Sequence, residues 1–243
     1  MSGMAEQGDF SGSSAELLYV DDSYLREFDA TVVRTGPGYV LLNRTAFYPK
    51  SGGQPSDTGL FQQGTQQARV LKVLKRGRDI FHYVDGTMSE GSVRGIIDWD
   101  SRFFNMRRHS AEHLLTGLFE MMDAGPKVYS DLEHLEFRPS EITEDDVRRV
   151  EAQFNEAVKA DVRLKIYYSA RRELEVGDDE RKRSFLEKIP KNVERLRMVE
   201  IPGYSLTFCF GTHVRSTREI GLLRELKLSV GKKDRRIVEF TLE

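Results

Sequence analysis

Two short motifs, far apart in the chain, place the strongest constraint on how it can fold. They are His109-Ser-Ala-Glu-His113 and Cys209-Phe-Gly-Thr-His213. On a helix, a spacing of four residues puts both side chains on one face, about 5–6 Å apart at Cβ. Imidazoles and a thiolate are ligands that a tetrahedral zinc site uses. The chain has five histidines and one cysteine. It therefore predicts a zinc ion that joins two distant segments through His109, His113, Cys209 and His213.

Composition indicates a soluble globular protein of one large domain or two small ones, with 243 residues, 39% of them hydrophobic and 31% charged. No apolar run approaches the roughly 20 residues that span a bilayer. Residues 1–18 are rich in Gly and Ser and lack a basic start followed by an apolar stretch, which predicts a disordered tail and not a secretory signal. A single cysteine cannot form an internal disulfide, which fits a reducing cytoplasm.

The charge is unevenly distributed, although the net charge is only −2. Residues 181–236 contain 15 Lys and Arg against 6 Asp and Glu, whereas residues 141–180 contain 7 basic and 12 acidic side chains. A basic C-terminal third favours one face that binds a polyanion such as nucleic acid. The simpler interpretation is a solvated helix and strand surface. The charged segment 178–190 leaves a similar choice between a solvated connection and a clamp on phosphates.

The first half of the chain has the pattern of a small β-barrel. From residue 19 to about residue 93, short apolar runs are separated by Gly, Pro, Asn and Asp, and strands are expected at 29–34, 38–42, 68–74 and 79–84. His82 is expected to pack inside one of these strands. The stretch Thr45–Gly59 is too rich in Gly and Pro to continue a strand. It predicts an ordered loop whose backbone closely approaches another domain or a ligand.

The second half mixes helices with strands. An apolar stripe at helical spacing predicts a helix over residues 100–123, which carries the first histidine pair. A capping-box-like start at Thr143 predicts a second helix. Strands are expected at 127–137, 162–168, 195–201, 221–229 and 237–242, with His134 at a surface or an edge. The predicted fold class is α+β: a tail (1–18), a β-barrel domain (19–95), and an α+β domain (96–243) with a mainly antiparallel sheet and the zinc site.

Three motifs in order resemble a known family. Asn105–Leu115, the pair Val199–Gly203 and Cys209–Val214, and Thr45–Gly59 are similar to the editing domain of alanyl-tRNA synthetases with its attached barrel. Free-standing versions form the AlaX family, and the resemblance runs from about Leu18 to the C-terminus, closest to the medium-length class. It implies a zinc-dependent hydrolase, not a ligase. This enzyme would act in trans at the acceptor end of mischarged tRNA(Ala), chiefly Ser-tRNA(Ala), with Gly-tRNA(Ala) as a further substrate in some members.

The resemblance also implies roles for individual residues. Thr45 is expected to read the serine side chain, because the family's matching threonine faces the amino-acid pocket and a hydroxyl partner disfavours alanine. Its simpler role is that of a threonine at a strand end or in a turn. Gln54 and Glu112 are weaker catalytic candidates: Gln54 would donate to the carbonyl or fix the loop, and Glu112 would act there or simply be solvated. Independently of the resemblance, basic side chains are candidate phosphate contacts, which position tRNA without specifying it: Arg107, Arg108, Lys232, Lys233, Arg235 and Arg236.

Some features leave alternatives open. Phe210 replaces a glycine of the family's second motif and Ser51 one of the loop; Phe210 would narrow the pocket or change substrate tolerance. Four protein ligands are typical of a structural zinc, since a catalytic zinc usually keeps one position open, whereas the resemblance implies a catalytic site between two domains. The competing functions are editing of another mischarged tRNA, such as Ser-tRNA(Thr), and a non-catalytic zinc-stabilised tRNA-binding module.

Overall fold

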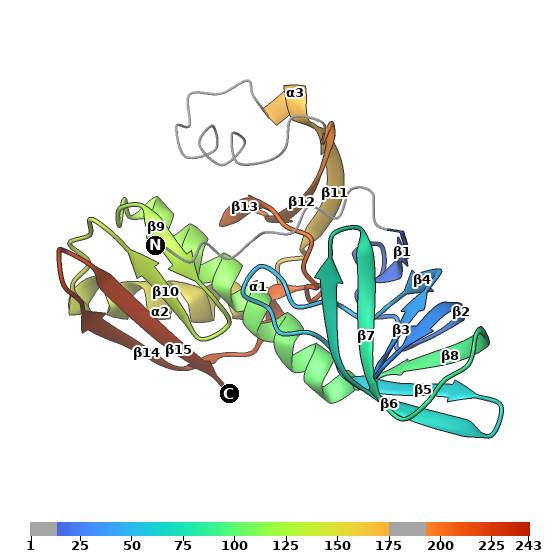
Figure 1. Ribbon diagram of the computed structural model, residues 1–243. Coiled ribbons are helices and arrows are strands. Elements are labelled where there is room, and N and C mark those ends of the chain that lie inside the picture. Colours follow the sequence, from blue (N-terminus) through green and yellow to red (C-terminus); the bar gives the residue numbers. More distant parts are fainter. Residues whose placement is uncertain (1–13, 175–192) are drawn as a thin grey trace. The chain divides into compact units, whose positions relative to one another are not determined.

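A computed structural model of the chain describes residues 14–174 and 193–243 (Figure 1). The chain divides into two compact units, one of residues 1–106 with 211–213 and the other of residues 107–210 with 214–243. This division falls inside helix α1 (Trp99–Met121), whereas the predicted domain boundary at 95/96 lies just before it. The predicted charged segment 178–190 and residues 1–13 of the predicted tail lie outside the described residues. Across the part described, no helix is long and apolar enough to cross a membrane.

The first unit contains a closed barrel with the strand order β2-β3-β7-β6-β5-β8 (Figure 1). Alternate side chains of β2, such as Phe28, Ala30 and Val32, are buried in its core, as period-2 patterning requires. Two strands, β5 and β8, were not among those predicted, because β5 buries only Phe61 and β8 begins with a glycine. The barrel strands are β2 (Glu27–Gly36), β3 (Tyr39–Leu42), β5 (Gly59–Gln63), β6 (Gln66–Arg76), β7 (Asp79–Asp85) and β8 (Gly91–Ile97).

The end of the predicted tail is ordered against this barrel. Strand β1 (Glu16–Leu17) pairs in parallel with β4 (Arg44–Thr45), and the 3-10 helix η1 (Leu18–Val20) follows. Ala15 is buried in the barrel core. Just before it, Ser14 donates a hydrogen bond from Oγ to Asp79 at 2.7 Å. Residues 14–18 therefore belong with the barrel, because Ala15 is buried in its core and Leu17 and Leu18 pack against that core.

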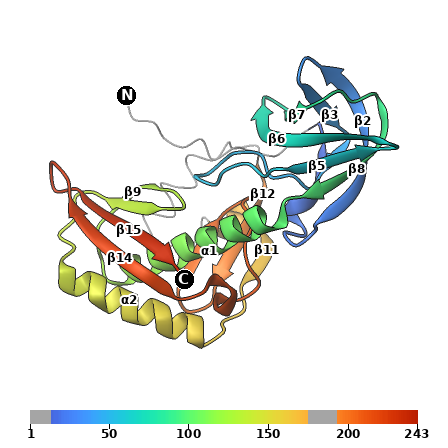
Figure 2. The same cartoon turned by 90° about the horizontal axis from the view of Figure 1, so that it is seen from below.

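The second unit is built around an antiparallel sheet in the order β14-β15-β10-β9, with α2 running along it (Figure 2). Helix α2 begins after Thr143 with the predicted capping box. His134 was expected at a surface or an edge, but its strand β10 lies between two others and its side chain is only 25% exposed. The elements are β9 (Lys127–Ser130), β10 (His134–Phe137), α2 (Glu144–Lys159), β14 (Leu223–Val230) and β15 (Arg236–Leu242).

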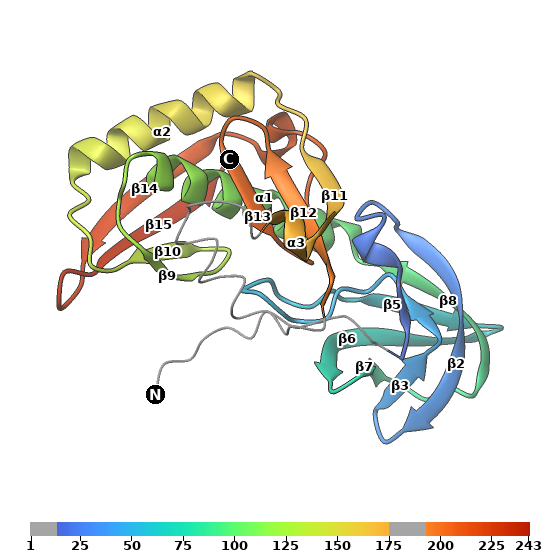
Figure 3. The same ribbon diagram turned by 90° about the horizontal axis from the view of Figure 1, so that it is seen from above.

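A second antiparallel sheet of the same unit has the order β11-β12-β13 (Figure 3). Its strands are β11 (Lys165–Ala170), β12 (Arg195–Ile201) and β13 (Ser205–Phe208); α3 (Arg171–Leu174) follows β11, and η2 (Thr217–Ile220) precedes β14. A Cβ on Gly117 of α1 would clash with the Tyr204 carbonyl, so α1 approaches the turn between β12 and β13 at backbone distance. The predicted α+β class, with an N-terminal barrel and mainly antiparallel sheets, is confirmed.

Candidate metal centre

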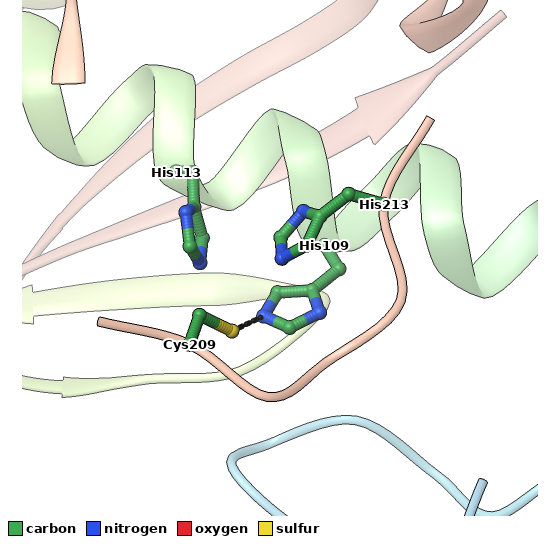
Figure 4. Close-up of side chains that lie close together, drawn as sticks. All are labelled: His109, His113, Cys209 and His213. Carbon is green, nitrogen blue, oxygen red and sulfur yellow. Dashed lines mark hydrogen bonds between the residues drawn. The ribbon is translucent and has the colours of Figure 1, made fainter. Parts of the chain in front are cut away.

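The four predicted ligand residues lie together. Helix α1 buries His109 and His113 on one face, with 4% and 5% of each residue exposed and ring centroids 4.9 Å apart. Cys209 and His213 lie on the loop that follows β13. One ligand atom from each of the four residues lies within 4.8 Å of all the others, and Figure 4 shows the side chains converging.

Their geometry and charge state fit a zinc ion. Tetrahedral zinc with bonds of about 2.3 Å to sulfur and 2.0–2.1 Å to nitrogen separates the two ligand atoms by about 3.5 Å. Cys209 Sγ lies 3.4 Å from His109 Nε2. Burial, assisted by His113, lowers the pKa of His109 to about 3, and burial lowers the pKa of His113 to about 4. Both rings are therefore neutral at pH 7 and keep a lone pair for a metal; the zinc itself remains a prediction.

Arg197 on β12 supports Cys209, one of the four predicted ligands. It is 1% exposed, donates from Nη1 to the Cys209 carbonyl at 2.6 Å, and accepts on its own carbonyl from Cys209 N at 3.1 Å. This residue was not predicted from the sequence. The sequence did contain a sign of its burial. Arg197, Val199 and Ile201 are two residues apart along β12 and so share one face, and Val199 and Ile201 are fully buried.

Glu112, a candidate catalytic residue, lies beside His113 on α1. It is 6% exposed, and its Oε1 accepts from Lys127 Nζ at 2.6 Å and from Thr116 Oγ1 at 2.9 Å. Burial raises the pKa of this carboxyl, but Lys127 and His113 outweigh burial and hold the pKa well below its usual range. Glu112 is a buried, ion-paired anion, so the alternative that it is solvated is wrong.

The glycine-rich loop forms a tight turn that presents Gln54. Ser51 and Gln54 exchange backbone hydrogen bonds of 3.2 and 2.9 Å, and Gly52 and Gly53 have φ angles of 52° and 79°. Two positive φ angles define a turn that glycine forms without strain. Ser51 is not in the left-handed region, so a serine fits where the family has a third glycine. Gln54, with no exposed surface, donates to Thr212 Oγ1 at 2.8 Å and accepts from Thr212 N at 3.2 Å.

Thr45 lies at the other end of the loop, inside the barrel unit. Its Oγ1 is 2.8 Å from His82 Nε2 and accepts from Phe47 N at 3.1 Å. Neither Thr45 nor His82 is exposed. Burial lowers the pKa of His82 to about 4, against weaker opposing effects of the Val40 and Ile80 backbone. The expectation that His82 packs within its strand is confirmed. His82 Nε2 and Phe47 N use two of the three hydrogen-bonding positions of the Thr45 hydroxyl.

A buried ion pair that the sequence analysis missed organises the base of this loop. Arg102 donates from Nε to both Asp57 carboxylate oxygens at 2.9 and 3.0 Å, and from Nη1 to the Ser23 carbonyl at 3.0 Å. Asp57 Oδ2 also accepts from Tyr48 N. The available signal was that Arg102 precedes the buried Met106 of α1 by four residues, which puts a charge on the apolar face.

The six candidate tRNA contacts do not form one cluster. Arg107 donates to the carbonyls of Ile220 and Glu243, and Arg108 lies 3.4 Å from Glu133. Glu243 and the β14–β15 hairpin lie at opposite ends of β15, roughly 20 Å apart. The other candidates lie at that hairpin or close to it. Lys232, Lys233 and Arg235 line a pocket of about 560 Å³ together with Arg138, and Arg236 donates to the Ile142 carbonyl.

Phe210 directly follows Cys209. Its ring packs edge-on against Phe208 at a centroid distance of 5.0 Å. Both belong to a small apolar cluster with Leu196 and Met198 of β12. The side chain thus has an apolar packing partner in the sheet next to Cys209.

Comparison with known proteins agrees with these motifs. Residues 13–101 match the family described as "tRNA synthetases class II (A)", and residues 196–238 match the "Threonyl and Alanyl tRNA synthetase second additional domain". An "Alanyl-tRNA editing protein AlaX-M" from Methanosarcina barkeri is 36% identical, and the match covers 93% of this chain and 98% of that protein. The chain belongs to the AlaX family of alanyl-tRNA editing proteins.

Two further relatives describe the range of this family. The AlaX-M protein of Saccharolobus solfataricus is 33% identical, and the match covers 94% of this chain and 99% of that protein. An "Alanine--tRNA ligase" from Ignicoccus hospitalis is 34% identical over 85% of this chain, but the match covers only 24% of the ligase. The resemblance drawn from the sequence motifs is confirmed.

Proposed function

We propose that this protein is a hydrolase that removes the wrong amino acid from mischarged tRNA(Ala) in trans, with Ser-tRNA(Ala) as the chief substrate and Gly-tRNA(Ala) as a second one. The observation that carries the proposal is the convergence of His109, His113, Cys209 and His213 in a member of the AlaX family. Close relatives carry the name alanyl-tRNA editing protein. The chain's single cysteine fits action in the reducing cytoplasm.

The bond to be broken is an ester between the amino acid and the terminal ribose of the tRNA. A zinc ion held by the four residues would supply a Lewis acid toward the ester carbonyl. The chain's own contribution is positioning. Arg197 fixes the Cys209 backbone, and Lys127 neutralises the Glu112 carboxylate beside His113. We retain Glu112 and Gln54 as candidates that act close to the reacting ester.

Discrimination against alanine is proposed to involve Thr45. A site that bonds a hydroxyl disfavours the analogue that lacks it, because a buried polar group then loses its partner. His82 provides an alternative partner for Thr45 Oγ1 at 2.8 Å. A Thr45→Val variant should then lower the ratio of serine release to alanine release. An unchanged ratio would limit Thr45 to packing inside the barrel.

The acceptor stem is proposed to contact basic side chains of the second unit. The strongest candidates are Lys232 and Lys233, which are exposed at the β14–β15 hairpin beside Arg138. Arg235 and Arg236 lie next to them but are engaged with Glu136 and the Ile142 carbonyl. Arg107 and Arg108 are weaker candidates, because Arg107 donates to two backbone carbonyls and Arg108 pairs with Glu133.

The deciding experiment compares Ser-tRNA(Ala), Ala-tRNA(Ala) and Ser-tRNA(Thr) as substrates, with and without a metal chelator. Serine release from the first substrate alone, lost with chelator and restored by zinc, is the expected result. Release from Ser-tRNA(Thr) instead would assign another tRNA. Tight binding of tRNA(Ala) with no release from any substrate would identify a non-catalytic tRNA-binding module.

A further inference from the structure

The glycine-rich loop contacts the motif Cys209–His213 through the residue pair Gln54 and Thr212. Both ends of the Gln54 side-chain amide are hydrogen-bonded to Thr212. Gln54 Nε2 donates to Thr212 Oγ1 at 2.8 Å, and Gln54 Oε1 accepts from Thr212 N at 3.2 Å. Neither residue is exposed. Thr212 directly precedes the ligand His213, and residues 211–213 pack as part of the first unit while their chain neighbours belong to the second.

The loop that carries Gln54 is anchored on both sides. The Ser51–Gln54 turn is closed by two backbone hydrogen bonds, and Tyr48 Oη donates to the Ser51 carbonyl at 3.1 Å. Lys50 N donates to the carbonyl of Val73 in β6 at 3.0 Å. At its base, the loop accepts from Arg102 through the Asp57 carboxylate and the Ala46 carbonyl. Gln54 is therefore carried by a loop that hydrogen bonds hold on both sides.

Arg102 is also connected to His213 through Ser23. Arg102 Nη1 donates to the Ser23 carbonyl at 3.0 Å, and Ser23 Oγ lies 3.5 Å from His213 N, which points toward it. The backbone at residues 212 and 213 is thus held at two consecutive amides. Gln54 Oε1 meets the first amide and Ser23 Oγ the second, and Arg102 donates to the Ser23 backbone and to both ends of the glycine-rich loop.

We propose that Gln54 and Thr212 are positioning residues that fix His213 as a metal ligand, so that the glycine-rich loop, which contains no ligand, determines the affinity of the metal site. Outer partners that orient ligands typically contribute 10–100-fold to metal affinity. Removing one partner of a buried hydrogen bond also leaves the other partner unsatisfied. The inference takes its metal site from the proposed function but concerns binding of the ion and not turnover.

The test measures the dissociation constant for Zn²⁺ by competition with a chromophoric chelator, using the full-length protein. Gln54→Ala should weaken zinc binding about 10–100-fold. Thr212→Val keeps the backbone N–H and should weaken it less. Because both variants break one shared contact, the double variant should bind no more weakly than Gln54→Ala alone.

Gln63→Ala is the matched control, since Gln63 also bonds through both ends of its amide, to the Ser89 backbone N and O, away from the metal motif. Its zinc affinity should equal that of the unmodified protein. Urea unfolding of each variant without metal would show that the Gln54 effect is not general unfolding. Unchanged zinc affinity in both Gln54→Ala and Thr212→Val, or an equal loss in Gln63→Ala, would overturn the inference.

The outcome is separable from the proposed function, because zinc titration requires no tRNA. Weakened zinc binding in Gln54→Ala supports the inference even if the unmodified protein releases no amino acid from any tRNA, a result that would reject only the hydrolase. Unchanged zinc affinity in Gln54→Ala, together with serine release by the unmodified protein, would reject the inference and leave the proposed hydrolase in place.

Discussion

The guanidinium of Arg102 and the carboxylate of Asp57 form an ion pair in which neither side chain has any exposed surface. Arg102 Nε donates to both carboxylate oxygens at 2.9 and 3.0 Å. Breaking such a pair costs more than the pair contributes, because the remaining charge stays buried without compensation. The pair therefore makes the base of the glycine-rich loop sensitive to a single substitution.

Asp57→Ala should lower the free energy of unfolding by about 3–5 kcal/mol, because it leaves Arg102 as an uncompensated buried charge. The control is Asp85→Ala, which removes an ion pair with Arg69 whose side chains are 55% and 73% exposed. Exposed pairs contribute about 0–1 kcal/mol. Urea unfolding of both variants measures the difference, and similar losses in the two would contradict the buried character of the Arg102 pair.

What the sequence could predict depended on local patterns. The period of apolar residues predicted α1 and most barrel strands, and two histidines four residues apart on α1 predicted a metal pair that indeed lies together with Cys209 and His213. The Gln54–Thr212 contact joins residues 158 positions apart. No periodicity or spacing encodes such a pair, because its partners meet only after the barrel and the loop have formed.

Charged residues of the interior were missed for a related reason. Arg102 and Arg197 are 0% and 1% exposed, yet an arginine in a sequence is ordinarily placed on a solvated face. Each departs from the apolar pattern of its own element, which is the one local sign of a buried charge. Which carboxylate or carbonyl satisfies that charge follows only from the three-dimensional structure.

His82 should make the stability of the protein depend on pH. Its pKa is about 4 in the folded protein, against 6.5 for an unperturbed histidine. Below pH 6.5, His82 binds a proton in the unfolded chain, whereas in the folded chain it stays neutral down to about pH 4. The free energy of unfolding therefore falls as the pH falls from 6.5 to 4. The total loss is about 3 kcal/mol. His82→Gln should remove this part of the pH dependence, as measured by urea unfolding from pH 7.5 to 4.5. Parallel plots of unfolding free energy against pH for the variant and the unmodified protein would disprove the prediction.

Cobalt provides a direct test of the thiolate ligand. Cys209 is the only cysteine of the chain, so a sulfur-to-metal charge-transfer band in the Co²⁺-loaded protein can come from no other residue. We expect one Co²⁺ per chain with this band, and loss of the band in Cys209→Ser. His109 is a second predicted ligand, and its Nε2 lies 3.4 Å from Cys209 Sγ. His109→Ala should therefore weaken Co²⁺ binding, while Cys209 still gives a weaker band. A Co²⁺ spectrum identical in Cys209→Ser and the unmodified protein would exclude the thiolate as a ligand.

The salt dependence of tRNA binding tests the β14–β15 hairpin. Each lysine that neutralises a phosphate contributes close to 1 to the slope of log affinity against log salt. Replacing Lys232 and Lys233 together by Ala should therefore weaken binding of tRNA(Ala) and reduce that slope by roughly 2 at most. The control is Arg148→Ala, which removes an equally positive side chain, 68% exposed, that pairs with Asp145 on α2.

Arg107→Ala separates this effect from a loss of structure. Arg107 donates to the carbonyls of Ile220 and Glu243, so its removal should lower the stability of the second unit and should change the salt slope less than the lysine double variant does. Fluorescence anisotropy with labelled tRNA(Ala) at several salt concentrations measures the slope in all four proteins. A slope that falls equally in Arg148→Ala and in the lysine double variant would mean that general positive charge, and not the hairpin, attracts the tRNA.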